Sequence, residues 1–337
     1  NEIRKFKIKQ KFGVALGMID DGSTEVKIEL GKDTATITSV NNINLKYFLS
    51  QRCEQLSSGK MLVVLLEGLS KGLKAGIEVT ICNFEDSHHT WEGVYRGVGI
   101  ALSKIFTPEN KLTTISSFDY ALVSRGTAET GVSVGIDFTQ KRLNKFSIKV
   151  NKSINVKNIN KLLEVFAKMG GFTMQVNFNA TVLSSSHVVM EDIGLVTGRA
   201  LLEILKLRME KFGVNGAGSS LQTINDLEKQ AIRVGVSVEG RKFWRFVPFY
   251  MSYQELKEKF LIGQNIYGNL RSEDLDDFID GLSGGLSASI MVHMKECTNA
   301  EKNWIEIFKG LGIALREVFT FNLYRKGVPP GVKATLS

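Results

Sequence analysis

The sequence predicts an α+β protein made of three tandem β-β-α-β-β-α half-units, with helices packed on one face of mixed sheets. Two observations predict this fold class: one amphipathic segment occurs three times, and period-two alternation precedes each copy. The chain has 337 residues, of which 43% are hydrophobic and 23% charged, as in ordinary globular domains. This length allows a sizeable core, and the composition excludes collagen and intrinsic disorder.

The repeated segment predicts one long helix in each unit. Its copies span residues 88–106, 187–205 and 301–319. Each copy has apolar residues at i, i+3, i+4 and i+7, and all share Gly-x-Ala-Leu, beginning at Gly99, Gly198 and Gly312. Because a glycine inside a helix costs about 1 kcal/mol relative to alanine, we expect these glycines to allow close packing of the helix on a sheet.

Strand-like segments and a shorter helix precede each long helix. The expected strands are residues 24–30, 35–38 and 77–81 in the first unit, 130–138, 145–150 and 173–178 in the second, and 231–238, 242–246 and 286–294 in the third. Shorter helices are expected at residues 159–168 and 273–282. This pattern divides the chain into three domains, residues 1–107, 108–212 and 213–337.

Composition limits the compartment and the partners. The formal net charge of +8 permits an anionic partner without naming one. Three separated cysteines without a Cys-x-x-Cys pair argue against a disulfide framework or a thiolate zinc site, and favour the cytoplasm. No apolar run is long enough for a membrane span, and no signal peptide is expected. We interpret the basic and aromatic residues 241–250 as a strand with one buried face, so we expect neither membrane nor nucleic acid as a partner.

The sharpest chemical feature is the pattern His88-His89-x-x-Glu92. On a helix, His88 and Glu92 share a face and can hold one ion, whereas His89 points about 100° away. Imidazole with carboxylate suits manganese, iron or zinc. The alternative is a helix start with two exposed histidines and a glutamate near its positive end.

The other two copies keep less of this pattern. The second copy retains His187 and Glu191 but has a valine in place of the second histidine. The third copy has Glu301 and Lys302 at the paired positions and keeps no imidazole. A lysine at such a position repels a metal ion.

With these copies in view, the chain resembles the imidazoleglycerol-phosphate dehydratase family. The matching segments, in chain order, are residues 125–130 (Arg-Gly-Thr-Ala-Glu-Thr), 186–194 (Ser-His-Val-Val-Met-Glu-Asp-Ile-Gly), 211–213 (Lys-Phe-Gly), 238–241 (Val-Glu-Gly-Arg) and 327–333 (Gly-Val-Pro-Pro-Gly-Val-Lys). The resemblance implies a ribosomal protein S5 domain 2-like fold and removal of water from imidazoleglycerol phosphate in histidine biosynthesis. Residues 108–337 resemble a complete member, and residues 1–107 resemble an extra half-unit.

The resemblance also implies a site. It assigns catalysis to Glu129, His187 and Glu191, and metal binding to His88, His89 and Glu92 together with His187 and Glu191. The family uses two manganese ions bound by many histidines, but this chain has four histidines in all, and the family's other positions hold Asn160, Lys161, Met291, Glu301 and Lys302. We therefore expect manganese, if bound, at a reduced site, and weak or no dehydratase activity.

The family's phosphate-binding positions are retained better in this sequence than its metal-binding positions. The resemblance places Lys211, Arg241 and Lys333 at or near the family's phosphate-binding cations. Lys211 lacks the bidentate fork of an arginine, and Pro330 replaces a serine. For each cation the alternative is an ordinary solvated surface charge.

Three functions remain open from the sequence: a divergent relative that binds a phosphorylated or anionic ligand, an active metal-dependent lyase, and a small-molecule kinase-like ATP binder. The last would use the glycine-rich residues 216–220 and 281–287, which we interpret as turns. Since the family's trimers contain six half-units, we expect two chains to associate as a homodimer. The alternative is a monomer whose extra unit is capped by residues 41–60.

Overall fold

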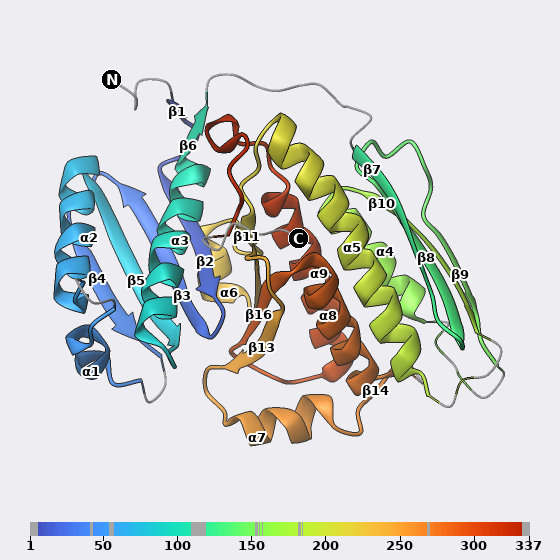
Figure 1. Cartoon of the computed structure of the whole chain (residues 1–337). Helices are drawn as coiled ribbons and strands as arrows, with labels where there is room; N and C mark the ends of the chain where they lie inside the picture. The colour runs from blue at the N-terminus through green and yellow to red at the C-terminus, as the bar shows by residue number, and fades with distance from the viewer. Residues whose placement is uncertain are drawn as a thin grey trace.

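The computed structural model describes residues 6–40, 43–53, 57–108, 119–151, 154, 156, 158–180, 183, 185–267 and 270–331. Within these residues the chain forms three four-stranded mixed sheets, and two long helices cover one face of each sheet (Figure 1). We name the three parts by their elements: unit 1 runs from β2 to α3, unit 2 from β7 to α5, and unit 3 from β11 to α9.

The bounds of the elements follow the chain. Unit 1 has β2 (Phe12–Ile19), β3 (Gly22–Leu30), β4 (Ala35–Ser39), α1 (Leu45–Ser50), α2 (Gly59–Leu73), β5 (Ala75–Asn83) and α3 (Ser87–Ile105). Unit 2 has β7 (Tyr120–Gly126), β8 (Thr130–Asp137), β9 (Lys145–Lys149), α4 (Ile159–Gly170), β10 (Thr173–Ala180) and α5 (His187–Lys211). A short ribbon of β1 (Phe6–Ile8) and β6 (Phe106–Pro108) lies beside unit 1.

Unit 3 carries more insertions than the other two. It has β11 (Ala217–Ser219), α6 (Ile224–Lys229), β12 (Ile232–Val238), β13 (Phe243–Pro248), α7 (Tyr253–Leu256), β14 (Asn265–Ile266), β15 (Leu270–Arg271), α8 (Ser272–Leu286), β16 (Ala288–Met294) and α9 (Ala300–Val318). A π-helical turn, Lys257–Leu261, and a 3-10 turn, Leu323–Arg325, complete it.

The α+β class and the three long helices are confirmed, but the order of elements within a unit differs from the expectation. Each unit is β-β-β-α-β-α, with sheet orders β2-β3-β5-β4, β7-β8-β10-β9 and β11-β12-β16-β13. The additional strand precedes the expected ones and does not follow the shorter helix. In each sheet the third strand pairs in parallel with the fourth, and a parallel pair needs the intervening helix as its crossover.

The units stack in layers. The sheets of units 1 and 3 face each other, and their contact is filled by Val14, Leu16 and Met18 from β2 and by Val247, Phe249 and Met291 from unit 3. On the other side of the unit 3 sheet, α8 and α9 pack against α5 and α4 of unit 2 (Figure 1). The sheet of unit 2 therefore lies at one end of the stack and the helices of unit 1 at the other.

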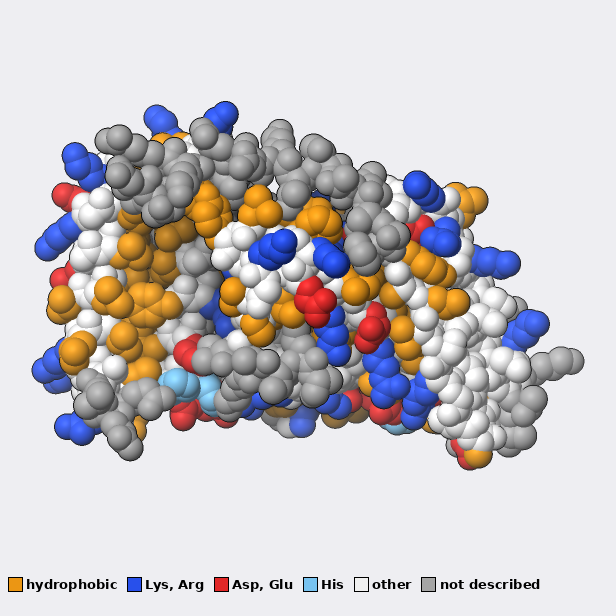
Figure 2. Space-filling view, turned by 45° about the horizontal axis from the view of Figure 1, so that its top comes forward, with side chains coloured by type: hydrophobic (Ala, Val, Ile, Leu, Met, Phe, Trp, Pro, Cys, Tyr) orange, Lys and Arg blue, Asp and Glu red, His pale blue; other side chains and the backbone are white. Residues whose placement is uncertain are grey.

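Two of the shared glycines allow helices to approach helices, which corrects the expectation of a helix on a sheet. A Cβ at Gly198 would lie 2.5 Å from a backbone carbonyl oxygen of α8, and one at Gly312 would lie 2.5 Å from a carbonyl oxygen of α4. A Cβ at the third shared glycine, Gly99 of unit 1, would have no atom of another described residue within 4 Å outside its own helix turn. The helix layer of unit 1 is open on this side, and Figure 2 shows hydrophobic side chains gathered there over α2 and α3.

Two other sequence interpretations can be compared with the structure. The basic and aromatic segment forms the strand β13 as expected, but both faces of this strand are buried, because Phe246 packs in one hydrophobic core and Val247 in another. The interpretation of residues 216–220 and 281–287 as turns was wrong, because most of the first forms β11 and most of the second lies inside α8. Within the described part of the chain, no helix is long and apolar enough to cross a membrane.

Candidate functional site

A polar pocket opens where unit 1 meets the C-terminal segment of unit 3. Its cavity volume is about 560 Å³. Helix α3 contributes Glu92, Tyr95 and Arg96, and the segment after α9 contributes Arg325, with Pro329, Pro330 and Gly331 beyond it. The walls combine two guanidinium groups, one carboxylate and several apolar surfaces. We call this cavity the α3 pocket.

Each arginine of the α3 pocket is fixed by neighbours. Arg96 donates to Ser237 and pairs with the carboxylate of Glu239, its Nη2 lying 3.3 Å from Oε2. Arg325 donates to the backbone oxygens of Asn215 at 3.0 Å and of Pro329 at 3.1 Å. Burial, and then the charge of Arg96, lower the pKa of Arg325, while burial raises the pKa of Glu239. Both guanidinium groups line the cavity, and guanidinium groups form strong hydrogen bonds with anions.

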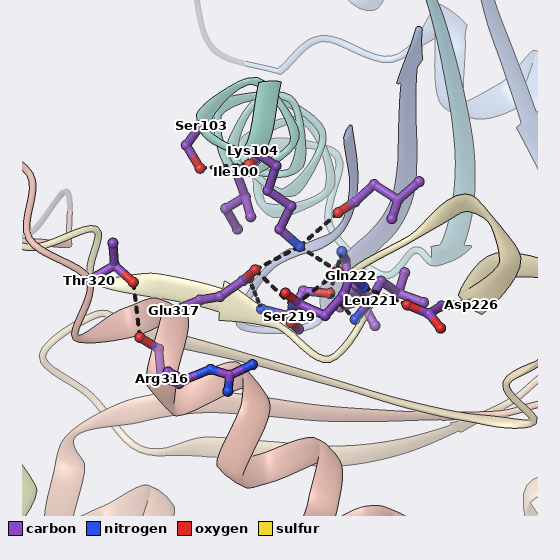
Figure 3. Close-up of polar contacts among 12 residues, drawn as sticks. Ile100, Ser103, Lys104, Ser219, Leu221, Gln222, Asp226, Arg316, Glu317 and Thr320 are labelled. Carbon is purple, nitrogen blue, oxygen red and sulfur yellow. Dashed lines mark hydrogen bonds and ion pairs between the residues drawn. The ribbon is translucent and has the colours of Figure 1, made fainter. Parts of the chain in front are cut away.

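The junction behind the α3 pocket is closed by a further ion pair (Figure 3). Lys104 of α3 lies with Nζ 2.8 Å from Oε1 of Glu317 on α9, and it also donates to the Val14 carbonyl oxygen at 2.9 Å. Glu317 accepts from the backbone N–H of Ser219 at 2.8 Å and from Gln222 Nε2 at 2.9 Å. Both ion-pair side chains are largely buried, so this network fixes α3 against unit 3.

The histidine pattern of the first unit lies at the start of α3. Asp86 caps this helix by accepting from the backbone N–H groups of His88 and His89. His88 Nε2 lies 3.5 Å from Oε1 of Glu92, so these two share a face as the spacing predicts. The positive end of the helix dipole also favours a carboxylate at the capping position.

His89 is held by two carboxylates of the chain. Its Nδ1 lies 2.7 Å from Oδ1 of Asp21, and its Nε2 lies 3.3 Å from Oδ2 of Asp20. Asp20 in turn pairs with Arg241. Both ring nitrogens of His89 are therefore engaged, and the guanidinium group of Arg241 lies beside the same carboxylates.

The second histidine pattern lies between units 2 and 3. His187 begins α5, with Nδ1 2.6 Å from Oδ2 of Asp277 on α8 and Nε2 3.4 Å from Oε2 of Glu191. The hydrogen bond with Asp277 raises the pKa of His187. In the described ranges, no group of three donor atoms within 4.8 Å of one another includes residues of either histidine pattern. The described residues thus do not fit a pair of ions held by both patterns.

A family model described as imidazoleglycerol-phosphate dehydratase matches residues 154–315, from the beginning of the unit 2 helices to the last helix of unit 3. Over this stretch the chain is similar to the imidazoleglycerol-phosphate dehydratase family. An imidazoleglycerol-phosphate dehydratase of Leuconostoc mesenteroides is 26% identical over 208 residues, which are 62% of this chain and 94% of the relative. One of Acetivibrio thermocellus is 28% identical over 195 residues, 57% of this chain and 87% of the relative. A crystal structure of IGPD from Pyrococcus furiosus, with 26% identity and a TM-score of 0.43, covers 64% of this chain and 100% of that one.

The dehydratase-like segment around residue 125 anchors a helix. Arg125 and Thr130 bind the two carboxylate oxygens of Asp192 on α5, the latter with Oγ1 2.8 Å from Oδ2. Glu129 lies exposed in the turn between β7 and β8, and its N–H donates to Thr127 Oγ1 at 3.2 Å. Asp192, which the sequence analysis did not single out, is the residue that this segment holds.

The cations predicted for the phosphate of the dehydratase family do not meet in the α3 pocket. Lys211 is the last residue of α5, and Arg241 pairs with Asp20, so neither is part of the pocket lining. Lys333 lies outside the described residues. The sequence analysis missed Arg96 and Arg325, although Arg96 follows Glu92 at i+4 and so shares its face of α3.

One described group of three donors has the spacing of a metal site. Atoms of Glu25, Cys82 and His293 lie within 4.8 Å of one another in the contact between the sheets of units 1 and 3. However, Arg233 donates to Oε1 of Glu25, the oxygen that also lies 3.5 Å from His293 Nδ1. The other ring nitrogen, His293 Nε2, lies 3.0 Å from Ser23 Oγ. Burial raises the pKa of the Cys82 thiol and lowers that of His293. A protonated thiol and an arginine at the carboxylate do not suit a cation, so we interpret this group as a buried polar network.

Proposed function

We propose that the protein is a dehydratase-like member of a family of histidine-biosynthesis lyases, with a degenerate metal site, that binds a phosphorylated or anionic ligand in the α3 pocket. The observation that carries the proposal is the pair of guanidinium groups, Arg96 and Arg325, that are held by hydrogen bonds in the lining of one cavity. Arginine is the side chain best suited to phosphate because its planar fork donates two parallel hydrogen bonds.

Weak or absent dehydratase activity is part of this proposal. It is supported by the engagement of His89 with Asp20 and Asp21, and by the absence of imidazole from the third copy of the repeated segment. Glu129, His187 and Glu191, the catalytic candidates of the sequence, are not among the residues that line the α3 pocket. A reaction that needs these groups and the pocket together would require a second chain.

Titration with inorganic phosphate tests the ligand proposal. Calorimetry on the full chain should detect binding, and Arg325→Met should weaken it by at least about tenfold, the loss expected for a charge-assisted pair. The matched control is Arg245→Met, because Arg245 pairs with Glu85 at a different surface. Equal binding by all three proteins, or no binding by the unchanged protein, would contradict the proposal.

The second candidate is an active metal-dependent lyase acting on imidazoleglycerol phosphate. One observation favours it: Glu92 both pairs with His88 and lines the α3 pocket. If one manganese ion binds at this reduced site, His88 and Glu92 are the donors this chain offers, and the ion would supply Lewis acidity. Turnover with added manganese that is lost in His88→Ala would establish this candidate and reject the first.

A kinase-like ATP binder receives no support from the backbone. Residues 281–285 lie within α8, where their N–H groups belong to the helix, and most of residues 216–220 form β11. The remaining expectations stay proposals: domains at residues 1–107, 108–212 and 213–337, a cytoplasmic location that suits three cysteines outside any disulfide, and self-association as a homodimer.

A further inference from the structure

The helix layer of unit 1 repeats the sequence of the helix layer of unit 3. Near its end α2 reads Gly-Leu-Ser-Lys-Gly-Leu at residues 68–73, and α8 reads Gly-Leu-Ser-Gly-Gly-Leu at residues 281–286. The two helices also end alike: Ser70 Oγ donates to the Ala75 carbonyl oxygen at 2.7 Å, and Ser283 Oγ to that of Ala288 at 2.7 Å. Helix α2 therefore corresponds to α8, and α3 corresponds to α9.

In unit 3, this layer is covered by helices of unit 2 that pack directly on glycine. A Cβ at Gly281 would lie 2.3 Å from a carbonyl oxygen of α5, and one at Gly285 would lie 2.0 Å from another. A Cβ at Gly312 on α9 would lie 2.5 Å from a carbonyl oxygen of α4. Side chains at these three positions would push the backbones of the helix layers apart.

The corresponding glycines of unit 1 are present but uncovered. Gly68, Gly72 and Gly99 are exposed, and a Cβ on any of them would meet nothing within 4 Å in the part of the chain that the structure describes. Large apolar side chains next to them are exposed to solvent, namely Met61 by 61%, Val64 by 66% and Leu65 by 57%. Phe278, the counterpart of Leu65 in α8, is 0% exposed. We call these six residues of unit 1 the α2–α3 face; Figure 2 shows the hydrophobic side chains there.

We propose that the α2–α3 face binds the same face of a second copy of this chain. The inference deepens the proposed self-association by naming its surface. Inside the chain, the layers of units 2 and 3 cover each other reciprocally, α5 on α8 and α4 on α9, as two equal parts do across a twofold axis. The helix layers of units 2 and 3 therefore cover each other within one chain. The helix layer of unit 1 has no such partner among the described residues, and the same layer is exposed in every other copy of the chain.

The described part of residues 41–60 does not cover this face. Helix α1 packs through Phe48 against Phe84 and Trp91 near the start of α3. Met61, Val64 and Leu65 remain exposed beside it. In the dimer, α2 of each copy would lie along α3 of the other, with Gly68 and Gly72 on α2 and Gly99 on α3 allowing the backbones to approach.

Sedimentation equilibrium of the full chain tests the inference. The unchanged protein should have twice the 37.4 kDa mass of one chain at micromolar concentration. A Cβ at Gly68 meets no other described residue within 4 Å, so we expect Gly68→Leu to fold, and Leu65→Arg places a charge on the α2–α3 face. Each should raise the dimer dissociation constant by at least about tenfold. The matched control is Leu143→Arg, at a residue of unit 2 that is 84% exposed and should not alter the dimer.

Two outcomes overturn the inference: a monomeric unchanged protein, or a dimer that neither Gly68→Leu nor Leu65→Arg weakens. Titration of the same samples with inorganic phosphate separates it from the ligand proposal. A monomer that binds phosphate would reject the dimer through the α2–α3 face and support the ligand proposal for the α3 pocket. A dimer that binds no phosphate would support the dimer and reject the ligand proposal.

Discussion

Replacing Lys104 by methionine is the sharpest test of how unit 1 is held to unit 3. The ammonium group of Lys104 lies 2.8 Å from Oε1 of Glu317 and 2.9 Å from the Val14 carbonyl oxygen, and it also donates to the Leu221 carbonyl. Methionine keeps most of the length of the side chain and removes all three interactions (Figure 3). The carboxylate would then remain at the junction without its cation.

The expected cost follows from burial. The side chains of Lys104 and Glu317 are 10% and 15% exposed. Breaking a buried pair by removing one partner costs about 3–5 kcal/mol. Because Glu317 keeps the hydrogen bonds from Ser219 and Gln222, we expect a value near the lower limit, about 3 kcal/mol.

Hydrogen exchange followed by mass spectrometry measures this loss of stability in the elements at the junction. A loss of about 3 kcal/mol should accelerate exchange in β2 and α3 by about a hundredfold, since 1.4 kcal/mol corresponds to a factor of ten. The control is Lys27→Met, which removes a 3.1 Å pair with Glu78 whose carboxylate side is 52% exposed. Such surface pairs contribute about 0–1 kcal/mol. If the two substitutions have equally small effects, the junction is not held by this network.

Three further predictions concern packing and protonation. Gly285→Ala should destabilise the protein by about 1–3 kcal/mol in thermal unfolding, because the new Cβ would lie 2.0 Å from a carbonyl oxygen of α5, whereas Gly284→Ala on the same helix should be tolerated. Burial lowers the pKa of His293 below its ordinary 6.5, so as the pH falls the unfolded chain binds a proton before the folded one does. This group's contribution to the free energy of unfolding should therefore be fully present above pH 6.5 and be lost as the pH falls below it. In urea unfolding, His293→Gln should make the free energy of unfolding less dependent on pH in this range. Asp277→Asn should lower the pKa of His187 toward 6.5, and an unchanged imidazole NMR titration would contradict the assigned cause.

The repeat was readable from the sequence because each long helix is amphipathic and carries Gly-x-Ala-Leu. The first strand of each unit was not found. Strand β2 is buried along nearly its whole length, between α3 on one face and the unit 3 sheet on the other, so its sequence does not alternate. Strand β11 has only three residues, too few for any period to show.

The candidate site was readable only in part. Spacing along one helix correctly joined His88 with Glu92, because i and i+4 lie on one face whatever surrounds the helix. It could not show that His89 meets Asp20 and Asp21, which are far away in the sequence and are brought near by the turn between β2 and β3. Side-chain contacts between units depend on how the layers stack, and a local sequence pattern does not predict that stacking.

The face-to-face contact of the unit 1 and unit 3 sheets lies within a single polypeptide. A covalent tether gives such a contact an effective concentration that does not depend on how much protein is present, of about millimolar order for short linkers. Dilution therefore cannot separate these two sheets, although it would separate two chains docked through α2 and α3. A protease cut between residues 108 and 119 would turn the permanent contact into one governed by mass action.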